Sequence, residues 1–352
     1  MVSENILIVE NLKKYYELRS SLLQVLGLSP PLYLKAVDDI GFSVAKGEIF
    51  CLVGESGCGK TTTGKIIVRL LEPTSGKILY KLSAETRKVL EPYGYTEEYI
   101  DIGKKYPKDV DKVLRREIQM IFQDPYSSLN PRMRIRDILE EPLVIQGIGK
   151  DRTERLEIIL RALTEVKLVP PQEFLDRYPH MLSGGQRQRI AIARALILKP
   201  NLIVADEPVS MLDVSIRVEV LQLMLDIRKS RGISYIFITH DLAVASYICD
   251  RMAVMYLGKI VESGDITKVI DNPMHPYTRA LMEAVPEPNP SNRLSLRKVG
   301  IIGEVPSAVN VPPGCRFHPR CPFAMDVCRK KEPPLVEVEK GHNVACWLHM
   351  KK

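Results

Sequence analysis

The stretch GEIFCLVGESGCGKTT, from Gly47 to Thr62, decides the fold of this chain. Its first half is an apolar run typical of a buried strand, and its second half fits the pattern G-x-x-x-x-G-K-[ST]. Glycines in such a loop free the backbone N–H groups to surround a phosphate, Lys60 adds a positive charge, and the Thr61 hydroxyl is a ligand for Mg²⁺. We expect a helix from about Lys60 to Leu71. The stretch therefore predicts an α/β protein that binds ATP and Mg²⁺.

The whole loop is expected to contact the nucleotide. The predicted residues are Gly54, Glu55, Ser56, Gly57, Cys58, Gly59, Lys60, Thr61 and Thr62. Cys58 stands at a free position of the pattern, and we assign it no chemical role. No tandem repeat is visible, so the chain has one such loop.

Acidic residues end another strand-like run, NLIVADEP, from Asn201 to Pro208. Ligands of α/β sheets bind at the carboxyl ends of the strands, where this pattern places Asp206. Asp206 is expected to join the Mg²⁺ shell, and Glu207 to polarise the attacking water as a general base. The alternative is an acidic cap at the start of a helix.

Two neutral side chains end further strand-like runs. His240 closes ISYIFITH, and Gln123 follows EIQMIF (Glu117 to Phe122). At the same edge of the sheet as Asp206, His240 is expected to contact the γ-phosphate. Gln123 is expected to orient water or join the Mg²⁺ shell. Each assignment depends on the others, because a lone histidine is more often structural than catalytic.

A second glycine turn opens LSGGQRQRIAIARAL, from Leu182 to Leu196. Small residues followed by a helix favour anion binding, because the helix N-terminus carries partial positive charge. The turn lacks a lysine at the place where the phosphate loop has one. It therefore cannot complete a phosphate site by itself.

Size and charge set limits on the class of protein. The chain has 352 residues, of which 45% are hydrophobic and 26% charged, values that allow one large domain with an appendage or two domains. No apolar run is long enough to span a membrane, and no export signal is visible at the N-terminus. The net charge is +7, and aromatic residues do not interleave with the basic residues near the C-terminus. We therefore expect no nucleic-acid partner.

The pattern divides the chain near residue 270. Residues 1–270 form an ATPase domain, with a helical subdomain at about 124–190, and residues 271–352 form a proline-rich extension. The segment Tyr80 to Glu117 is polar, and we interpret it as a surface excursion between two strands.

Four of the seven cysteines gather in the extension, namely Cys315, Cys321, Cys328 and Cys346. Without an export signal a disulfide framework is not expected. The spacing C-x5-C-x6-C-x17-C is neither a common zinc pattern nor a ferredoxin run. A metal could stabilise a tail with few core residues. Free thiols, a zinc ion on four thiolates and an iron–sulfur cluster all stay open, with His318 and His342 as alternative ligands.

The order of these motifs resembles the ATP-binding subunit of ABC transporters over about residues 5–265. The motifs that carry the resemblance are the phosphate loop, Gln123, LSGGQ, Asp206–Glu207, SMLD and His240. The oligopeptide/dipeptide importer branch, and within it the OppF/DppF type, is the more similar. That likeness rests on FQDPYSSLNPRMRIRDILEEPL, VSMLDVSIRVEVLQLM, NPMHPYTRALMEAVP and GCRFHPRCPFAMDVC.

The resemblance implies a fold and a mode of assembly. The fold would combine a RecA-like P-loop core, an antiparallel β subdomain and a helical subdomain with a small cysteine-containing extension. Two ATPase subunits would pack head to tail, so that the second glycine turn of one closes over the ATP of the other. The residues implied are Ser183, Gly184, Gly185, Gln186 and, at the seam, Asp213. Tyr16, or else Tyr15, would stack on the adenine, and the four cysteines would hold a [4Fe–4S] cluster, with Zn²⁺ as the alternative.

The resemblance also implies a function. The chain would hydrolyse ATP at the cytoplasmic face of the cell membrane, as a peripheral subunit of an oligopeptide importer. Its partners would be two membrane-spanning permease subunits, a second ATPase (a paralogue or a second copy) and, indirectly, an extracellular substrate-binding protein. The alternatives are an oligosaccharide importer of the same branch, a soluble ABC ATPase acting on DNA or the ribosome, and a non-catalytic nucleotide-gated module.

Overall fold

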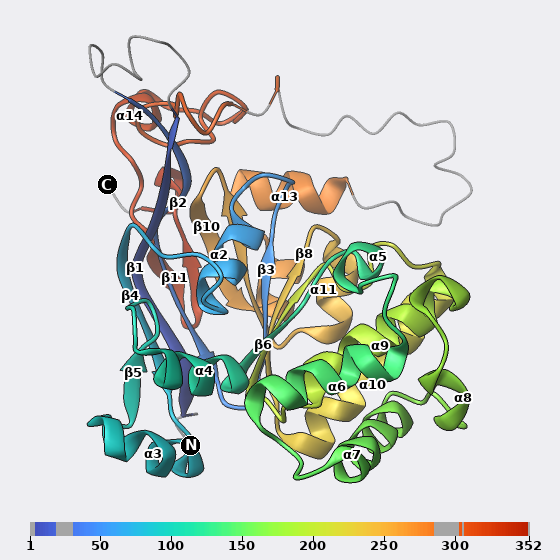
Figure 1. Ribbon diagram of the computed structural model, residues 1–352. Helices are drawn as coiled ribbons and strands as arrows, with labels where there is room; N and C mark the ends of the chain where they lie inside the picture. Colours follow the sequence, from blue (N-terminus) through green and yellow to red (C-terminus); the bar gives the residue numbers. More distant parts are fainter. Residues whose placement is uncertain (1–3, 19–30, 285–302, 305, 351–352) are drawn as a thin grey trace.

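Two β-sheets organise the protein, as Figure 1 shows for the computed structural model. The structure describes residues 4–18, 31–284, 303–304 and 306–350. Part of the segment between Glu17 and Leu32, which separates the predicted adenine-stacking tyrosines from the next strand, lies outside the described residues. So do residues 285–302 of the proline-rich extension.

The larger sheet has eight strands in the order β11-β12-β10-β9-β3-β8-β7-β6. These strands are β3 (Ile49–Val53), β6 (Ile118–Ile121), β7 (Leu202–Asp206), β8 (Ser234–Thr239), β9 (Arg251–Tyr256), β10 (Lys259–Asp265), β11 (Val336–Glu339) and β12 (His342–Val344). The five from β9 to β6 pair in parallel. Every residue of β3, β7 and β8 is buried, as expected for a parallel sheet covered on both faces. The predicted α/β core is confirmed.

The smaller sheet is antiparallel, in the order β2-β1-β4-β5. Its strands are β1 (Asn5–Leu18), β2 (Leu32–Ala45), β4 (Ser75–Lys81) and β5 (Tyr99–Asp101). Its apolar side shares one hydrophobic core with α2 (Lys60–Ile67) and one face of the large sheet. This is the antiparallel β subdomain that the resemblance implied.

Helices cover the other face of the large sheet (Figure 1). They are α5 (Pro125–Ser128), α6 (Ile135–Gln146), α7 (Arg152–Glu165), α8 (Gln172–Leu175), α9 (Gly184–Leu196), α10 (Val214–Arg231) and α11 (Leu242–Ile248), with the short η2 (Pro179–Met181) before α9. The first four lie within the range predicted for the helical subdomain, and α9 begins inside that range and extends past residue 190. α9 is buried around most of its circumference, and its Ile190 and Ile192 belong to the same core as β3 residues Ile49 and Cys51.

The helix α2 ends at Ile67, four residues before the predicted end. Arg69 adopts a left-handed φ of 61°, and the N–H groups of Leu70 and Leu71 turn back to the Lys65 carbonyl. Such a turn satisfies carbonyls that the helix end would otherwise leave free.

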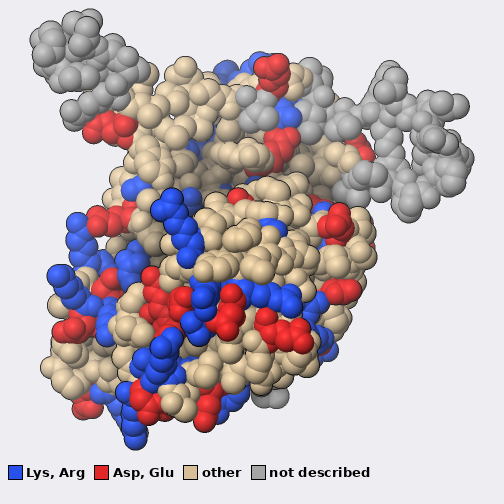
Figure 2. Space-filling view, turned by 45° about the vertical axis from the view of Figure 1, so that its right-hand side comes forward, with Lys and Arg blue, Asp and Glu red and all other residues tan. Residues whose placement is uncertain are grey.

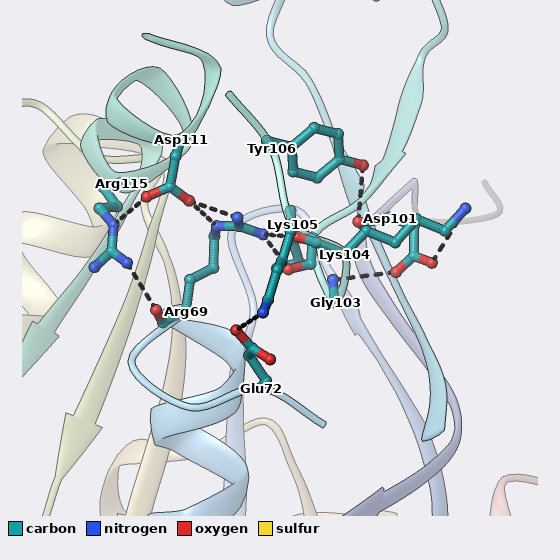
Figure 3. A network of polar contacts seen from close by, with 10 residues as sticks. Arg69, Glu72, Asp101, Gly103, Lys104, Lys105, Tyr106, Asp111 and Arg115 are labelled. Carbon is teal, nitrogen blue, oxygen red and sulfur yellow. Dashed lines mark hydrogen bonds and ion pairs between the residues drawn. The ribbon is translucent and has the colours of Figure 1, made fainter. Parts of the chain in front are cut away.

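The segment from Tyr80 to Glu117 is folded rather than a plain surface excursion. It contains α3 (Ala84–Leu90), η1 (Glu91–Tyr93), β5 and α4 (Lys108–Glu117). Some of its apolar side chains, among them Leu90, Ile100 and Leu114, are buried in the core shared with α2, whereas Val89 and Tyr93 are exposed. Figure 3 shows Arg69 bridging the segment to the core, with its Nε donating to Asp111 at 2.8 Å. Apolar residues spaced through a polar segment gave too weak a pattern for the sequence to show this docking.

Residues after 270 continue the large sheet. Residue 270 itself lies in α12 (Ile266–Asp271), which is followed by α13 (Pro276–Glu283), α14 (Asp326–Lys330), β11, β12 and η4 (Trp347–His349). β12 pairs antiparallel with β10, and the wholly buried Phe317 joins the main core. The expectation of a weakly structured tail is therefore wrong: Phe317 packs on the ATPase core, and Met274, Val344 and Cys346 form a small buried cluster of their own.

A disulfide bond, which the sequence did not predict, joins two cysteines outside the cluster. Cys51 in β3 and Cys249 after α11 form a disulfide, with Cα atoms 6.0 Å apart. In the part of the chain that the structure describes, no helix combines the length and apolar character needed to cross a bilayer.

Candidate nucleotide site

The phosphate loop is wedged between two strands at the carboxyl edge of the large sheet. A Cβ at Gly54 would lie 2.3 Å from the Met255 carbonyl oxygen, and one at Gly59 would lie 2.2 Å from that of Ala36. Both residues also have positive φ, 154° and 108°. Only glycine fits such a backbone at such a distance. The glycines of the motif therefore fix the loop against β9 and β2.

Lys60 starts α2 and turns back into the loop. Its ammonium donates to the carbonyls of Gly54 at 2.7 Å and Glu55 at 3.0 Å. The residue is only 5% exposed. A buried positive charge inside a loop of backbone N–H groups suits a phosphate ligand.

Asp206 and Thr61 meet beside this charge. The Thr61 hydroxyl donates to Asp206 Oδ1 at 3.0 Å, and Asp206 is 3% exposed at the end of β7. Burial raises the pKa of the Asp206 carboxyl, and the bond from Thr61 lowers it. The negative charge of Glu207 raises this pKa further. A carboxylate and a hydroxyl are oxygen donors of the kind Mg²⁺ takes. The pair therefore fits a magnesium site.

The structure brings Glu207, His240 and Gln123 together. His240 Nδ1 lies 3.0 Å from Glu207 Oε1, and Gln123 Nε2 donates to Oε2 at 3.2 Å. Glu207 has a left-handed φ of 45°, and its backbone N–H donates to the Ile238 carbonyl at 2.9 Å. A left-handed non-glycine residue is strained, and such strain gathers at functional sites. The carboxylate that follows β7 is thus held by groups that follow the two flanking strands, β6 and β8.

The second glycine turn caps α9. The Ser183 side chain accepts from the Gln186 N–H at 3.3 Å, and the Gln186 side chain accepts from the Ser183 N–H at 3.0 Å. This reciprocal cap leaves other N–H groups of the first turn, at Gly184 and Gly185, outside the helix ladder. A Cβ at Gly185 would lie 2.5 Å from Ile216 Cγ2 in α10.

The two glycine turns belong to opposite sides of the large sheet. α9 packs in the core that holds Ile49 and Val53, whereas α2 packs in the core that holds Phe50 and Leu52. Asp213 is the residue before α10, and α10 packs in the same core as α9. One chain by itself therefore presents the second turn on a different face from its own phosphate loop.

Tyr16 is held within the small sheet. It pairs with Leu34 across β1 and β2, and the Lys14 ammonium lies 5.1 Å from its ring. Tyr15 points to the other side of the strand, where its hydroxyl donates to Asp38. Asp38 also accepts from Arg316 of the extension.

The extension reaches the phosphate loop, which the sequence did not indicate. Arg320 donates to both carboxylate oxygens of Glu55, at 2.9 and 3.3 Å, and the Glu55 N–H donates to the Tyr277 hydroxyl at 2.9 Å. Arg316 and Arg320 both lie between Cys315 and Cys321 in CRFHPRC. Two basic residues in this short stretch were the available signal, but nothing in a sequence links them to a loop so far upstream.

The four cysteines of the extension lie near one another. The Cys315 N–H donates to the Cys328 carbonyl at 2.8 Å. Burial raises the pKa of the Cys315 thiol to about 12, with further contributions from Cys328, Cys346 and Cys321, and raises that of Cys346 to about 11. Among the described residues, however, no three or more His, Cys, Asp or Glu side chains are arranged to hold a metal ion. The arrangement as it stands does not fit an iron–sulfur cluster or a zinc ion.

The two histidines considered as ligands have other partners. His342 Nε2 lies 2.7 Å from Glu262 Oε1 in a wholly buried pair, and His318 Nδ1 lies 2.9 Å from the Cys315 carbonyl oxygen.

Comparisons with known proteins agree with this geometry. The family profile described as ABC transporter matches residues 37–210, and that of the oligopeptide/dipeptide transporter C-terminal region matches residues 261–328. The second match starts inside β10, before the boundary predicted near residue 270.

Similar proteins cover nearly the whole chain. The dipeptide transport ATP-binding protein DppF of Haemophilus influenzae is 43% identical over 96% of this chain and 94% of its own length. The oligopeptide transport ATP-binding protein AppF of Bacillus subtilis is 44% identical over 98% of both chains.

Solved structures show the same fold. The ATP-binding cassette MJ0796, described as a dimer bound to ADP and Pi, aligns with a TM-score of 0.59 and 26% identity over 74% of this chain and 98% of that one. The cassette MJ1267 in its ADP conformation aligns with a TM-score of 0.57 and 26% identity over 77% and 96%. The chain therefore belongs to the ABC transporter family, as one of its ATP-binding, ATP-hydrolysing subunits.

Proposed function

We propose that this subunit powers the uptake of oligopeptides or dipeptides. The observation that carries the proposal is the presence, in one chain, of a complete nucleotide site and the C-terminal region of oligopeptide/dipeptide transporters. The relatives named for dipeptide and oligopeptide transport span the same two parts. Uptake of oligosaccharides is the second candidate, because nothing in the nucleotide site touches cargo.

The residues of the site divide the work of hydrolysis. Lys60 and the loop N–H groups would bind the β- and γ-phosphates. Thr61 and Asp206 would hold Mg²⁺, which would neutralise charge on the phosphates. Glu207 accepts the proton of the attacking water, and His240 and Gln123 orient that carboxylate. His240, whose side chain is 57% exposed, would also contact the γ-phosphate.

A second ATPase subunit completes the site. The turn of Ser183, Gly184 and Gly185 has N–H groups to offer but no lysine, and it lies on the face opposite its own phosphate loop. In a head-to-tail pair it would close over the γ-phosphate held by the partner, whose lysine supplies the missing charge. ATP would then join the subunits, and hydrolysis would release them.

Membrane-spanning subunits would dock beside the helical subdomain. The segment from Gln123 to Asn130 connects the site to α6, and within it the Tyr126 side chain is 59% exposed with the Arg187 guanidinium 3.8 Å from its ring centroid. An exposed aromatic residue on a connection to the catalytic carboxylate suits a coupling contact. The subunit would accordingly act as a peripheral protein on the cytoplasmic face of the membrane.

The charge on one face of the protein favours protein partners over nucleic-acid partners. On the face drawn in Figure 2, basic and acidic side chains are interspersed over the described residues. Nucleic-acid binding usually requires a field of positive charge.

Cargo-stimulated ATP hydrolysis by the reconstituted importer tests the cargo. The subunit would be co-expressed with its membrane subunits and its binding protein. ATP hydrolysis would then be measured with peptides and with oligosaccharides of matched size. We expect several-fold stimulation by peptides alone. Stimulation by sugars alone would replace the peptide proposal with the second candidate.

The cysteines of the extension form a separate proposal. Ligation of a [4Fe–4S] cluster by Cys315, Cys321, Cys328 and Cys346 would require the thiols to move closer and lose their protons. Their proximity in one small segment supports it, and their present arrangement does not. Anaerobic purification followed by iron and zinc analysis decides the case. About four irons per chain would support the cluster, one zinc would support the alternative, and no metal would leave free thiols.

A further inference from the structure

Glu55, in the phosphate loop, is held at three points. Its backbone N–H donates to the Tyr277 hydroxyl at 2.9 Å, and its carbonyl accepts from the Lys60 ammonium at 3.0 Å. Its carboxylate accepts two bonds from Arg320, at 2.9 and 3.3 Å. Two of the three partners come from residues after 270, in the part of the chain that the nucleotide motifs do not cover.

Arg320 is itself fixed by its surroundings. Its side chain is 8% exposed, and its guanidinium lies 5.8 Å from the ring centroid of Tyr256. Tyr256, Tyr277 and Phe317 pack on one another with centroids 4.7 to 5.5 Å apart. A two-bond arginine–carboxylate pair on a packed aromatic base keeps its geometry better than an exposed pair does.

The pair matters because of where the carboxylate lies. Glu55 brings a negative charge to a loop that binds a polyanion, and a like charge nearby weakens anion binding. Arg320 cancels that charge and turns the carboxylate toward the extension. We infer that Arg320 is a positioning residue for ATP binding, acting through Glu55 on the phosphate loop.

A second arginine of the same segment also joins the extension to the ATPase core. Arg316 donates to the Leu257 carbonyl and to Asp38, which also accepts from Tyr15. The segment from Arg316 to Arg320 thus links the small sheet to the phosphate loop. This inference rests on ATP binding and not on the identity of the cargo.

The test compares three variants with the wild-type subunit. Arg320→Ala leaves the Glu55 carboxylate uncompensated. Arg329→Ala is the matched control, because Arg329 is an exposed cation of the same extension. The double variant Arg320→Ala/Glu55→Gln removes both charges of the pair. The dissociation constant of MgATP, and KM and kcat of hydrolysis, are measured without membrane subunits, so a wrong cargo cannot affect the result.

We expect Arg320→Ala to raise the Kd and KM for ATP about three- to tenfold, with kcat nearly unchanged and the deficit smaller at high salt. The double variant should return to within about twofold of wild type, because no stranded carboxylate remains. Arg329→Ala should match wild type. A purely structural role for Arg320 would instead give a loss that neither Glu55→Gln nor salt reverses, and that result would overturn the inference.

The inference stays testable if Arg320→Ala does not fold. Glu55→Gln alone leaves the Arg320 guanidinium facing the loop without its counter-charge. It should therefore bind ATP about twofold more tightly than wild type. An unchanged or weaker affinity would count against the charge argument.

Discussion

His240 Nδ1 lies 3.0 Å from Glu207 Oε1, although the two residues follow different strands. The other carboxylate oxygen accepts from Gln123, so the Glu207 carboxylate is held on both sides. The strained backbone of Glu207 is fixed by its bond to the Ile238 carbonyl. A carboxylate aimed by two neighbours and by its own backbone is prepared to accept a proton from water.

Replacing Glu207 with glutamine should separate binding from turnover. The amide keeps the shape of the side chain and its polar contacts but cannot act as a base. We expect ATP affinity to stay within a few-fold while kcat falls by about 10²- to 10⁴-fold. Lys60→Ala should instead weaken ATP binding itself. Hydrolysis by Glu207→Gln at the wild-type rate would show that another group is the base.

Replacing Asp206 with asparagine should stabilise the nucleotide-free protein. Burial and the neighbouring Glu207 charge raise the pKa of Asp206, so its ionised form costs free energy in the folded state near neutral pH. Asparagine removes that charge and keeps an acceptor for Thr61. We expect the free energy of unfolding to rise by about 0.5–2 kcal/mol, with Mg²⁺-dependent hydrolysis lost. Thermal unfolding without nucleotide measures the first effect, and a lower Tm would contradict it.

The bonds that Asp38 accepts from Tyr15 and Arg316 should make the stability of the fold fall at acid pH. Burial by itself would raise the pKa of Asp38, but bonds from Tyr15 and Arg316 hold it below its usual value. A carboxyl with a lowered pKa stabilises the fold above the pKa of the unfolded chain, about 3.9, and that contribution is lost as pH falls through the folded-state value.

Asp38→Asn measures this contribution. At pH 7 the variant should unfold about 1–3 kcal/mol more easily than wild type, and the difference should shrink below about pH 4. Asp271→Asn, at an exposed position at the end of α12, should show neither effect. A difference between Asp38→Asn and wild type that stayed constant from pH 7 to pH 3 would contradict the assignment.

Short-range patterns predicted the core of this protein well. The strand, glycine loop and helix around Lys60 are contiguous in sequence, so spacing alone indicates how they meet. Asp206, His240 and Gln123 could be brought to the same edge because parallel strands share their carboxyl ends.

Long-range packing could not be predicted in the same way. The pairing of β12 with β10 and the contact of Arg320 with Glu55 join segments far apart in the chain, and neither segment has a pattern that names its partner. The Tyr80 to Glu117 segment was misjudged for a related reason: only scattered residues such as Leu90 and Leu114 are buried, and its fixation depends on Arg69 from another element.

Two defective subunits should restore one working site when mixed, if ATP is held between a phosphate loop and the second glycine turn of another copy. Lys60→Ala damages the loop, and Ser183→Glu puts a negative charge where the turn would meet the γ-phosphate. A head-to-tail pair of the two variants has one intact composite site and one doubly defective site. At equal amounts, random pairing should give up to about a quarter of wild-type hydrolysis, while each variant alone stays near background.

The Glu207→Gln protein should also double its mass in light scattering when ATP is added. No restoration and no ATP-dependent dimer would exclude pairing between copies of this chain, and the same mixing experiment with a paralogous ATPase would then decide whether the site is shared with that subunit.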